Sequence, residues 1–183
     1  MDGNEGFLFL INRNKGDAIT ITLWGSEANV YSTSERAEKI RQQTAAASGL
    51  RIQGVEHYEV VRNEQEKRRA GTPTPVRARL EGEGTSLYAR VSFYHFPKEG
   101  DIDAAVESFD KSIPAVREMA GNQGLKFMID RHKGKVMAVT LWDSPLALKL
   151  SSQLSNSVSQ QTAGMSGLTI QGVEHYEVAK VEH

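Results

Sequence analysis

IQGVEHYEV occurs twice in this chain, at Ile52 to Val60 and again at Ile170 to Val178. The same offset of 118 residues aligns TLWGS (Thr22 to Ser26) with TLWDS (Thr140 to Ser144). It also aligns the opening MDGNEG with MAGNQG, which begins at Met119. About half of the sixty aligned positions are identical, and a repeat of this length is typical of a duplicated domain rather than a solenoid. We therefore expect a tandem of one fold.

The first copy is shorter than the second at its amino-terminal end. Met1 aligns with Met119, so residues 87–118 have no counterpart ahead of Met1. Three explanations stay open: the true start codon lies upstream, the sequence is a fragment, or the first copy is a half-domain. We expect residues 1–62 to be a partial repeat, 63–86 a charged linker rich in Pro and Gly, and 87–183 a complete unit.

The first copy has the pattern of a hairpin, a helix and a strand. Apolar residues 7–11 and the threonine-rich run 18–24 flank a short turn that ends in Gly16, which predicts a β-hairpin. Ser26 is suited to cap the next helix and Gly49 to end it. Residues 50–61 are predicted to form one long strand.

The second copy predicts strands over residues 87–96, 125–130, 136–142 and 170–178. Helices are expected from Asp101 and from about Ser144. The resulting order β-α-β-β-α-β is that of the ferredoxin-like α+β fold. Because the helices of one such unit cover one face of its sheet, we expect the other face to meet the second copy. The fold class is then a dimeric α/β barrel built from two ferredoxin-like units in tandem.

Strand alternation separates two faces in the second copy. We assign the polar face to the space between the two sheets, and place the apolar alternates Met137, Val139 and Leu141 under the helices. The residues on the polar face are Tyr88, Arg90, Ser92, Tyr94, Thr140 and Trp142. On the last strand, His175 shares a face with Val173, and the sequence does not decide whether that face is inward.

Composition narrows the classes of function. The net charge is −1, which gives no long-range attraction to nucleic acid or to a membrane surface. The basic cluster Lys67 to Arg69 is read as part of a solvated linker. The absence of cysteine excludes disulfides and thiolate chemistry. The sequence has no apolar run of the roughly 20 residues that span a bilayer, so we expect a cytoplasmic protein.

The hairpin ending TLWxS, the helix after it and the closing strand GVEHYEV resemble antibiotic biosynthesis monooxygenase (ABM) domains of the dimeric α/β-barrel superfamily. The resemblance covers nearly all of both copies but not the linker. It implies oxygenation of a small phenolic or quinol-type aromatic without a cofactor, in which the substrate's own phenolate supplies an electron to oxygen. Other members of the family degrade haem.

The haem-degrading relatives use an asparagine on the first strand, a tryptophan that ends the third strand and a histidine on the following helix. Trp142 and Trp24 match the tryptophan. Ala89 lies near the asparagine position, and Ser152 and Ser34 lie near the histidine position. Since two of the three residues are missing, we do not expect haem degradation, and we expect no cofactor.

Six residues are candidates for a site, each with a structural alternative. We assign Trp142, Tyr94 and His175 to catalysis, and Arg90, Trp24 and Thr140 to substrate binding. The tryptophans could instead fill the barrel end, and His175 could be a packed strand residue. Arg90, if buried, needs an anionic ligand or a carboxylate, for which Glu174 and Asp130 are the candidates.

Two classes of function stay open. One is an ABM-like monooxygenase acting on a small aromatic, and the other is a non-catalytic barrel that binds a small ligand or self-associates. We find no metal-ligand spacing among His95, Glu174 and Glu56. The partners expected are a small aromatic molecule and either a second chain in a homo-oligomer or the other copy in an intrachain pseudo-dimer.

Overall fold

The computed structural model describes residues 3–65, 86–96, 102–152, 160 and 167–182. Its strands form one antiparallel sheet with the order β2-β1-β7-β4-β6-β5-β3. The strands are β1 (Asn4–Asn12), β2 (Asp17–Trp24), β3 (Glu59–Gln65), β4 (Leu87–His95), β5 (Asn122–Asp130), β6 (Lys135–Trp142) and β7 (Thr169–Glu182). Strands from both predicted copies therefore belong to the same sheet.

The helices lie where the sequence predicts them, with one break. The first predicted helix is split at Thr33 into α1 (Glu27–Ser32) and α2 (Ser34–Ser48). Ser26 caps α1, because its side chain accepts a hydrogen bond from the Asn29 backbone N–H at 3.2 Å. Gly49 ends α2 with a φ of 71°, which a glycine adopts without a steric cost. In the second copy, α4 (Ile102–Arg117) precedes β5, and residues 145–152 are helical after β6.

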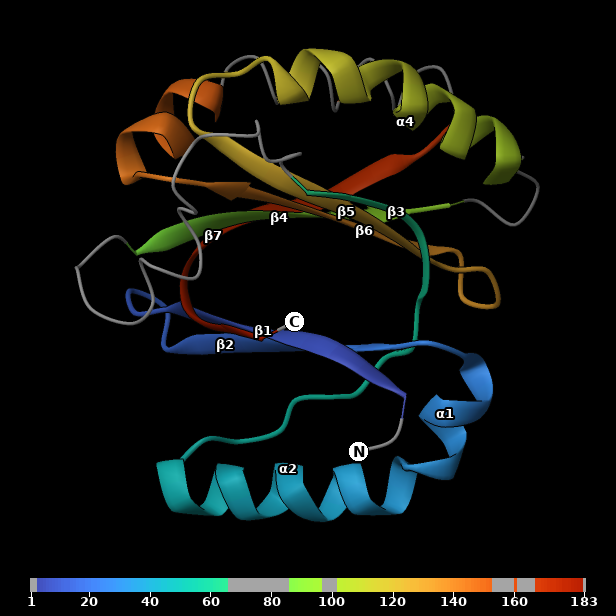
Figure 1. Ribbon diagram of the computed structural model, residues 1–183, viewed down its shortest axis with the longest axis vertical. Coiled ribbons are helices and arrows are strands. Elements are labelled where there is room, and N and C mark those ends of the chain that lie inside the picture. Colours follow the sequence, from blue (N-terminus) through green and yellow to red (C-terminus); the bar gives the residue numbers. More distant parts are fainter. Residues whose placement is uncertain (1–2, 66–85, 97–101, 153–159, 161–166, 183) are drawn as a thin grey trace, which may run out of the picture.

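The sheet is curled so that its two ends form an upper and a lower layer (Figure 1). β3, β4, β5 and β6 lie in the upper layer beneath α4, and β1 and β2 lie in the lower layer above α2 (Figure 1). β7 bends from the upper layer down to β1, where the described chain ends (Figure 1). Two of these interfaces form hydrophobic cores: α4 against the upper layer, and the upper layer against the lower layer.

The second copy has ferredoxin-like topology. The neighbours β7-β4-β6-β5 place the first strand of the unit, β4, between its third and fourth strands. α4 connects β4 to β5, and the helix at residues 145–152 follows β6. The prediction of an α+β fold with a β-α-β-β-α-β unit is confirmed.

Two crossed strand pairs join the copies, and both have the same register. Below, the counterpart of a residue is the one 118 positions away. Phe7 lies opposite Glu182 in the β1–β7 pair, and their counterparts Leu125 and Glu64 lie opposite each other in the β5–β3 pair. The register shift of the first pair, between Phe9 and Leu10, recurs in the second between the partners of Phe127 and Met128. The two junctions are thus related residue by residue.

Two hydrophobic cores correspond to two faces of the upper sheet layer. Between α4 and the sheet lie Tyr94, Phe109, Phe127, Val136, Ala138 and other apolar side chains, which we call the helix-side core. Between the sheet layers lie Leu8, Leu10, Ala89, Val91, Met137, Val139, Tyr176 and their neighbours, which we call the inter-sheet core. β4, β5 and β6 are therefore buried on both faces, whereas residues 59–64 of β3 are half-buried or exposed.

This arrangement reverses the face assignment made from the sequence. Val139 packs between the sheet layers rather than under the helices, and Tyr94 packs under α4 rather than in the barrel. Arg90 and Thr140 lie opposite each other on β4 and β6, in the alternation that contains Tyr94. The prediction that Arg90, Tyr94, Thr140 and Trp142 line the inter-sheet space is wrong, because the helices cover the polar face.

The repeated stretch has different structures in the two copies. Residues 170–178 lie within β7 and pair with β4, whereas residues 50–58 are not in a strand. Strand structure in the first copy begins at Glu59, where β5 becomes the neighbour. The prediction of one long strand over residues 50–61 is wrong. Residues 52–60 have the same sequence as residues 170–178, but no strand equivalent to β4 lies beside residues 50–58 among the described residues.

The predicted boundary at residue 62 falls inside β3, and most of the predicted linker lies outside the described residues. The domain division therefore stays a prediction. Among the helices that the structure describes, none is long and apolar enough to cross a membrane.

Candidate functional site

Arg90 lies at the centre of a row of polar side chains that crosses the helix-covered face of the sheet. On β4 it is opposite His175 of β7 on one side and Thr140 of β6 on the other. Directly opposite residues in antiparallel strands point to the same face, with their Cβ atoms about 4.5–5.5 Å apart. Local alternation alone thus brings three of the six predicted site residues together.

The Arg90 side chain is buried without a full set of partners. The residue is 3% exposed, and among the described residues its Nε and Nη1 atoms have no hydrogen-bond acceptor. Burial lowers the pKa of Arg90, because removing water disfavours the charged guanidinium; the nearby Tyr94 acts in the opposite direction. A buried cation with free donors is costly unless an anionic or oxygen-rich group completes it. The geometry therefore favours binding of an oxyanion.

The carboxylates predicted as structural partners for Arg90 are engaged elsewhere. Glu174 forms an ion pair with Lys15 at 2.6 Å and accepts a hydrogen bond from the Tyr176 hydroxyl. Asp130 accepts hydrogen bonds from the backbone N–H groups of His132 and Lys133 in the β5–β6 turn. No ion pair joins either Glu174 or Asp130 to Arg90 among the described residues.

Trp142 and Thr140 are linked on β6. The indole Nε1 of Trp142 donates to Thr140 Oγ1 at 3.0 Å. Trp142 is fully buried, so its ring is held by its surroundings as well as by this bond. Thr140 accepts from the indole and keeps its own O–H available as a donor. Trp142 therefore orients a hydroxyl beside Arg90.

His175 is the ionisable neighbour of Arg90 on β7. Desolvation is the main cause that lowers the pKa of His175, and the positive charge of Arg90 lowers it further. The imidazole is thus kept neutral at physiological pH, in which state one ring nitrogen can accept a proton. Its side chain is exposed, as is that of Val173 on the same face of β7. The β7 end of the row is therefore its solvent-accessible end.

Tyr94 lies on the same face as Arg90, four residues further along β4. It is buried in the helix-side core with Phe96 and Phe109. Its electrostatic effect raises the pKa of Arg90, against the effect of burial. Trp142 is opposite Tyr88, at the other end of β4, so Tyr94 and Trp142 flank Arg90 from opposite directions.

Trp24 is not part of this group. It ends β2, which is separated from β6 in the sheet by β1, β7 and β4. Its neighbour across the ladder is Asn4 of β1. The structure thus brings Arg90, His175, Thr140 and Trp142 into one row, extends it with Tyr94, and leaves Trp24 in the lower layer.

The sequence prediction missed one polar residue next to this row. Asn122 begins β5 opposite Trp142, and its Nδ2 has no hydrogen-bond acceptor among the described residues. Its counterpart Asn4 is satisfied, since Asn4 Nδ2 donates to the Leu23 carbonyl at 3.3 Å. Both copies have asparagine at this position, and that match in the sequence could have marked Asn122 as a candidate site residue.

Metal coordination has no candidate in the described part of the chain, where no three His, Asp or Glu residues cluster as potential ligands. The site is therefore best described as a row of hydrogen-bond donors and one neutral imidazole on an otherwise apolar surface. Such a row can hold and polarise an oxygen-bearing aromatic ring.

No family model matches the chain. An uncharacterized protein of Mycobacterium tuberculosis is 22% identical over 168 residues, which are 91% of this chain and 68% of that protein. Among solved structures, an anthrone oxidase-like protein has a TM-score of 0.64 at 12% identity, with 99% of this chain and 79% of that chain covered.

Two proteins from Listeria have a similar fold. One, from Listeria monocytogenes, is described as an uncharacterized ferredoxin fold protein related to antibiotic biosynthesis monooxygenases, with a TM-score of 0.54, 13% identity, and coverage of 98% and 83% of the two chains. The other is a monooxygenase-like protein from Listeria innocua, with a TM-score of 0.53, 12% identity and coverage of 95% and 80%. This chain thus has the ferredoxin-like α+β fold of proteins related to the ABM monooxygenases.

Proposed function

We propose that the protein is an ABM-like monooxygenase that oxidises a small phenolic or quinol-type aromatic without a bound cofactor. The observation that carries the proposal is the buried Arg90 guanidinium, whose Nε and Nη1 lack acceptors among the described residues. A phenolate oxygen would supply both the negative charge and the lone pairs that this group lacks. The similarity of the fold to an anthrone oxidase-like protein supports the same substrate class.

In the proposed reaction, Arg90 holds the phenolate oxygen and thereby favours the ionised form of the substrate. His175, neutral at physiological pH, accepts the phenolic proton from the exposed end of the row. The electron-rich phenolate passes an electron to O2, and the two radicals combine at the activated carbon. Loss of water then leaves a carbonyl: one oxygen atom enters the substrate, and the other leaves as water with two substrate hydrogens.

The remaining side chains would act on orientation. Thr140, aligned by the Trp142 indole, donates its O–H to a second oxygen of the substrate. Trp142 acts as a positioning residue, because it is fully buried and reaches the substrate through Thr140. Tyr94 would donate a proton to the leaving peroxide oxygen from the buried end. Trp24 would not contribute to this site.

The assembly belongs to the proposal. Two tandem ABM-like copies, the first comprising residues 1–62 and the second residues 87–183, would form an intrachain pseudo-dimer. The equal registers of the β1–β7 and β5–β3 pairs support this, since a two-fold related dimer repeats each junction in that way. We place the protein in the cytoplasm. A homo-oligomer is the alternative assembly.

A non-catalytic barrel is the second candidate. The observation that favours it is the complete burial of Trp142, which keeps the indole away from any ligand in this conformation. In that case the row around Arg90 would bind an anionic aromatic without turning it over.

Oxygen consumption separates the two candidates. The purified chain is mixed with a panel of hydroxylated aromatics, including anthrones and hydroquinones, in an oxygen electrode, with apo-buffer autoxidation subtracted. We expect one O2 consumed per aromatic oxidised, and a loss of at least about tenfold in rate for Arg90→Met, because one charge-assisted hydrogen bond contributes about 1.5–3 kcal/mol. Arg36→Met, at an exposed site on α2, is the matched control. Ligand binding without oxygen uptake would support the non-catalytic barrel.

A further inference from the structure

The first copy has an open surface at the place where the second copy carries β4 and α4. In the second copy, β4 pairs with β6 on one side and β7 on the other. The counterparts of β6 and β7 in the first copy are β2 and the stretch 51–64. Among the described residues, β2 pairs with β1 alone, and residues 51–58 pair with no strand. A strand position between them is therefore vacant in the described part of the chain.

The two occurrences of IQGVEHYEV show the effect of a neighbouring strand, because one has β4 beside it and the other has no such strand among the described residues. IQGVEHYEV is strand throughout where β4 lies beside it, and residues 52–58 of the first occurrence are not. The side-chain exposures differ little, at 45% and 44% for Ile52 and Val55 against 36% and 38% for Ile170 and Val173, so the two occurrences differ in backbone pairing rather than in side-chain burial. Since the side chains are the same, the difference in structure comes from the partner strand.

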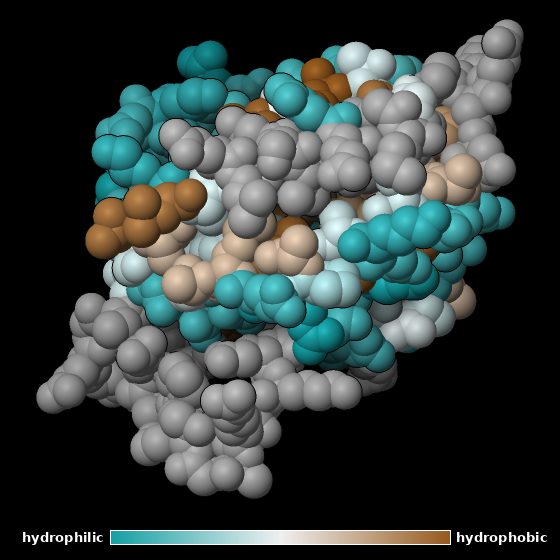
Figure 2. Space-filling model, turned by 90° about the horizontal axis from the view of Figure 1, so that it is seen from above, coloured by the Kyte–Doolittle hydropathy of each residue, from teal (hydrophilic) through white to brown (hydrophobic). Residues whose placement is uncertain are grey.

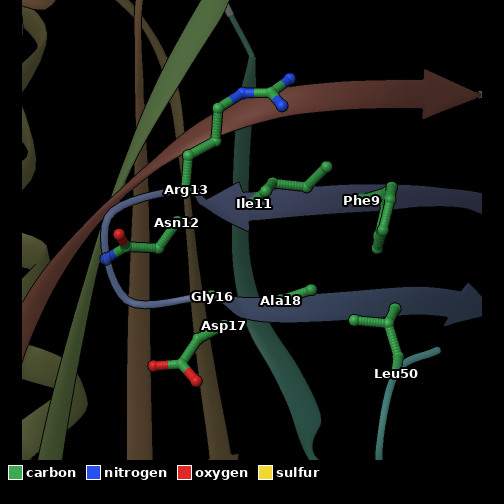
Figure 3. Close-up of a pocket in the computed structure, with 8 residues that line it drawn as sticks. All are labelled: Phe9, Ile11, Asn12, Arg13, Gly16, Asp17, Ala18 and Leu50. Carbon is green, nitrogen blue, oxygen red and sulfur yellow. The ribbon is translucent and has the colours of Figure 1, made fainter. Parts of the chain in front are cut away.

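The helix that would follow such a strand also has a vacant place. In the helix-side core, Phe109 of α4 stacks on Phe127 of β5, with ring centroids 3.8 Å apart and an interplanar angle of 12°. The counterpart of Phe127 is Phe9, which is partly exposed. Phe9 and Ile11 line a hollow of about 330 Å³ with Ala18 of β2 and Leu50. Figure 3 shows these four side chains along the hairpin, with Leu50 on the β2 side.

The hairpin turns give an independent comparison. Gly16 and Gly134 are counterparts with φ values of 71° and 64°. A Cβ on Gly134 would lie 2.7 Å from the carbonyl oxygen of Phe96, the residue after β4, whereas a Cβ on Gly16 would meet nothing within 4 Å. The turn of the first copy thus has open space where the end of a β4-like strand would pass.

We propose that this surface is a docking site for a polypeptide strand–helix unit of the same pattern as residues 87–117. The strand enters between β2 and residues 51–58, which become its second neighbour, and the amphipathic helix covers Phe9, Ile11 and Ala18. Residues 51–58 run between α2 and the lower layer in Figure 1, so docking requires this segment to move into the sheet.

The second copy shows what kind of segment fits this surface, because β4 and α4 hold the equivalent position there. There α4 packs on the helix-side core, and the described surface seen from above α4 is mostly hydrophilic, with apolar side chains in small groups (Figure 2). A second chain is a poorer occupant, because its own β4 and α4 are already committed between β6 and β7 and over the helix-side core. Donating them would uncover as much apolar surface as it covers. This inference does not depend on the proposed oxidation chemistry.

The test supplies such a unit at the amino terminus of the full chain. A duplicate of residues 86–118 is fused directly ahead of Met1, which reproduces the natural Glu118–Met119 junction. Backbone amide exchange is then followed at residues 52–58, with the identical residues 170–176 of the same molecule as the internal standard. We expect exchange at 52–58 to be fast in the unextended chain and to slow by at least about 100-fold in the extended chain.

Two controls locate the effect. Val91→Pro within the added segment removes a strand N–H and should abolish the protection, and Phe9→Asp in the hollow should do the same from the other side. Fast exchange at residues 52–58 in a monomeric, folded extended chain would overturn the proposal. So would an unextended chain that sediments as a dimer with β2 and residues 52–58 protected, since a second copy would then be the occupant.

Discussion

Arg90 on β4 and His175 on β7 are direct cross-strand neighbours, and the pKa of each is lowered by burial. The charge of Arg90 lowers the pKa of His175 further. The pair therefore combines a buried cation that lacks acceptors among the described residues with an imidazole held neutral. This combination distinguishes the second copy from the first, where the counterpart His57 packs edge-on against Tyr31 at 6.0 Å.

Arg90→Met should stabilise the ligand-free protein. The substitution removes a buried charge with unsatisfied donors and keeps most of the side-chain volume, so we expect the free energy of unfolding to rise by about 1–3 kcal/mol. Urea denaturation measures the change. The same variant should lose the increase in stability that an aromatic ligand gives the wild type. If Arg90→Met lowers the stability of the ligand-free protein, the guanidinium has a structural partner instead.

Acid should destabilise the protein through His175. Because its pKa in the folded state lies below the ordinary value of 6.5, the unfolded chain binds this proton more readily. The free energy of unfolding therefore falls as the pH drops through about 6.5 toward the folded-state pKa. His175→Asn should flatten this part of the stability profile, and Arg90→Met should flatten it partly. Arg36→Met, at an exposed site on α2, is the control that should retain the wild-type slope.

Lys126 and Asn63 form a polar contact across the β5–β3 junction, with Nζ and Oδ1 2.5 Å apart. Their counterparts across the β1–β7 junction are the apolar pair Leu8 and Val181. Burial lowers the pKa of Lys126, so its charge is disfavoured in the fold. Asn63→Val alone should destabilise by about 1–3 kcal/mol, because it leaves a buried ammonium group without its acceptor.

The double substitution Lys126→Leu with Asn63→Val should restore or exceed wild-type stability. It replaces the polar pair by the apolar pair that the equivalent junction already uses, and such replacements are often neutral or stabilising. A double-mutant cycle in urea measures the coupling. Additive losses in the double variant would show that the two junctions are not packed equivalently.

Phe127 and Phe9 are counterparts with different surroundings, which makes them a matched pair for truncation. Phe127 is buried under Phe109, so Phe127→Ala should cost about 3–5 kcal/mol. Phe9 is partly exposed at the open hollow, and Phe9→Ala should cost about 1–2 kcal/mol. Thermal and urea unfolding of the two variants give the comparison. Equal losses would mean that the hollow at Phe9 is filled in solution.

Much of the fold could be predicted from sequence, because repeats, turns and alternation are local signals. The hairpins, the Ser26 cap, the Gly49 helix end and the β-α-β-β-α-β order all follow from residues close in the chain. The extent of the strand at residues 50–61 could not, because residues 52–60 are identical to residues 170–178, which do form a strand. Its structure depends on whether a neighbour such as β4 is present.

The sequence predicted which candidate residues share a face of the second copy but assigned that face to the wrong side of the sheet. Alternation correctly groups Arg90 with Thr140, yet it does not say which group meets the helices. Both faces of β4 and β6 are buried, so neither face is exposed to solvent. The rule that apolar residues point inward and polar residues outward therefore does not identify the face that meets the helices. Arg90 and Thr140 lie on the face that the helices cover, with Tyr94 of the helix-side core. Trp24 was assigned because it aligns with Trp142 in the repeat. That alignment does not show that β2, unlike β6, has no strand equivalent to β4 beside it among the described residues.

The central claim is that Arg90 recognises an aryl oxyanion, and the ionisation of a bound chromophoric phenol tests it most directly. 4-Nitrophenol absorbs differently as phenol and phenolate, so its pKa can be read while it is bound. We predict that binding to the wild-type chain lowers this pKa by about 1–2 units, the equivalent of one charge-assisted hydrogen bond. Arg90→Met should abolish the shift and Arg36→Met should retain it. An unshifted pKa in the wild type, or an equal shift in Arg90→Met, would contradict the account.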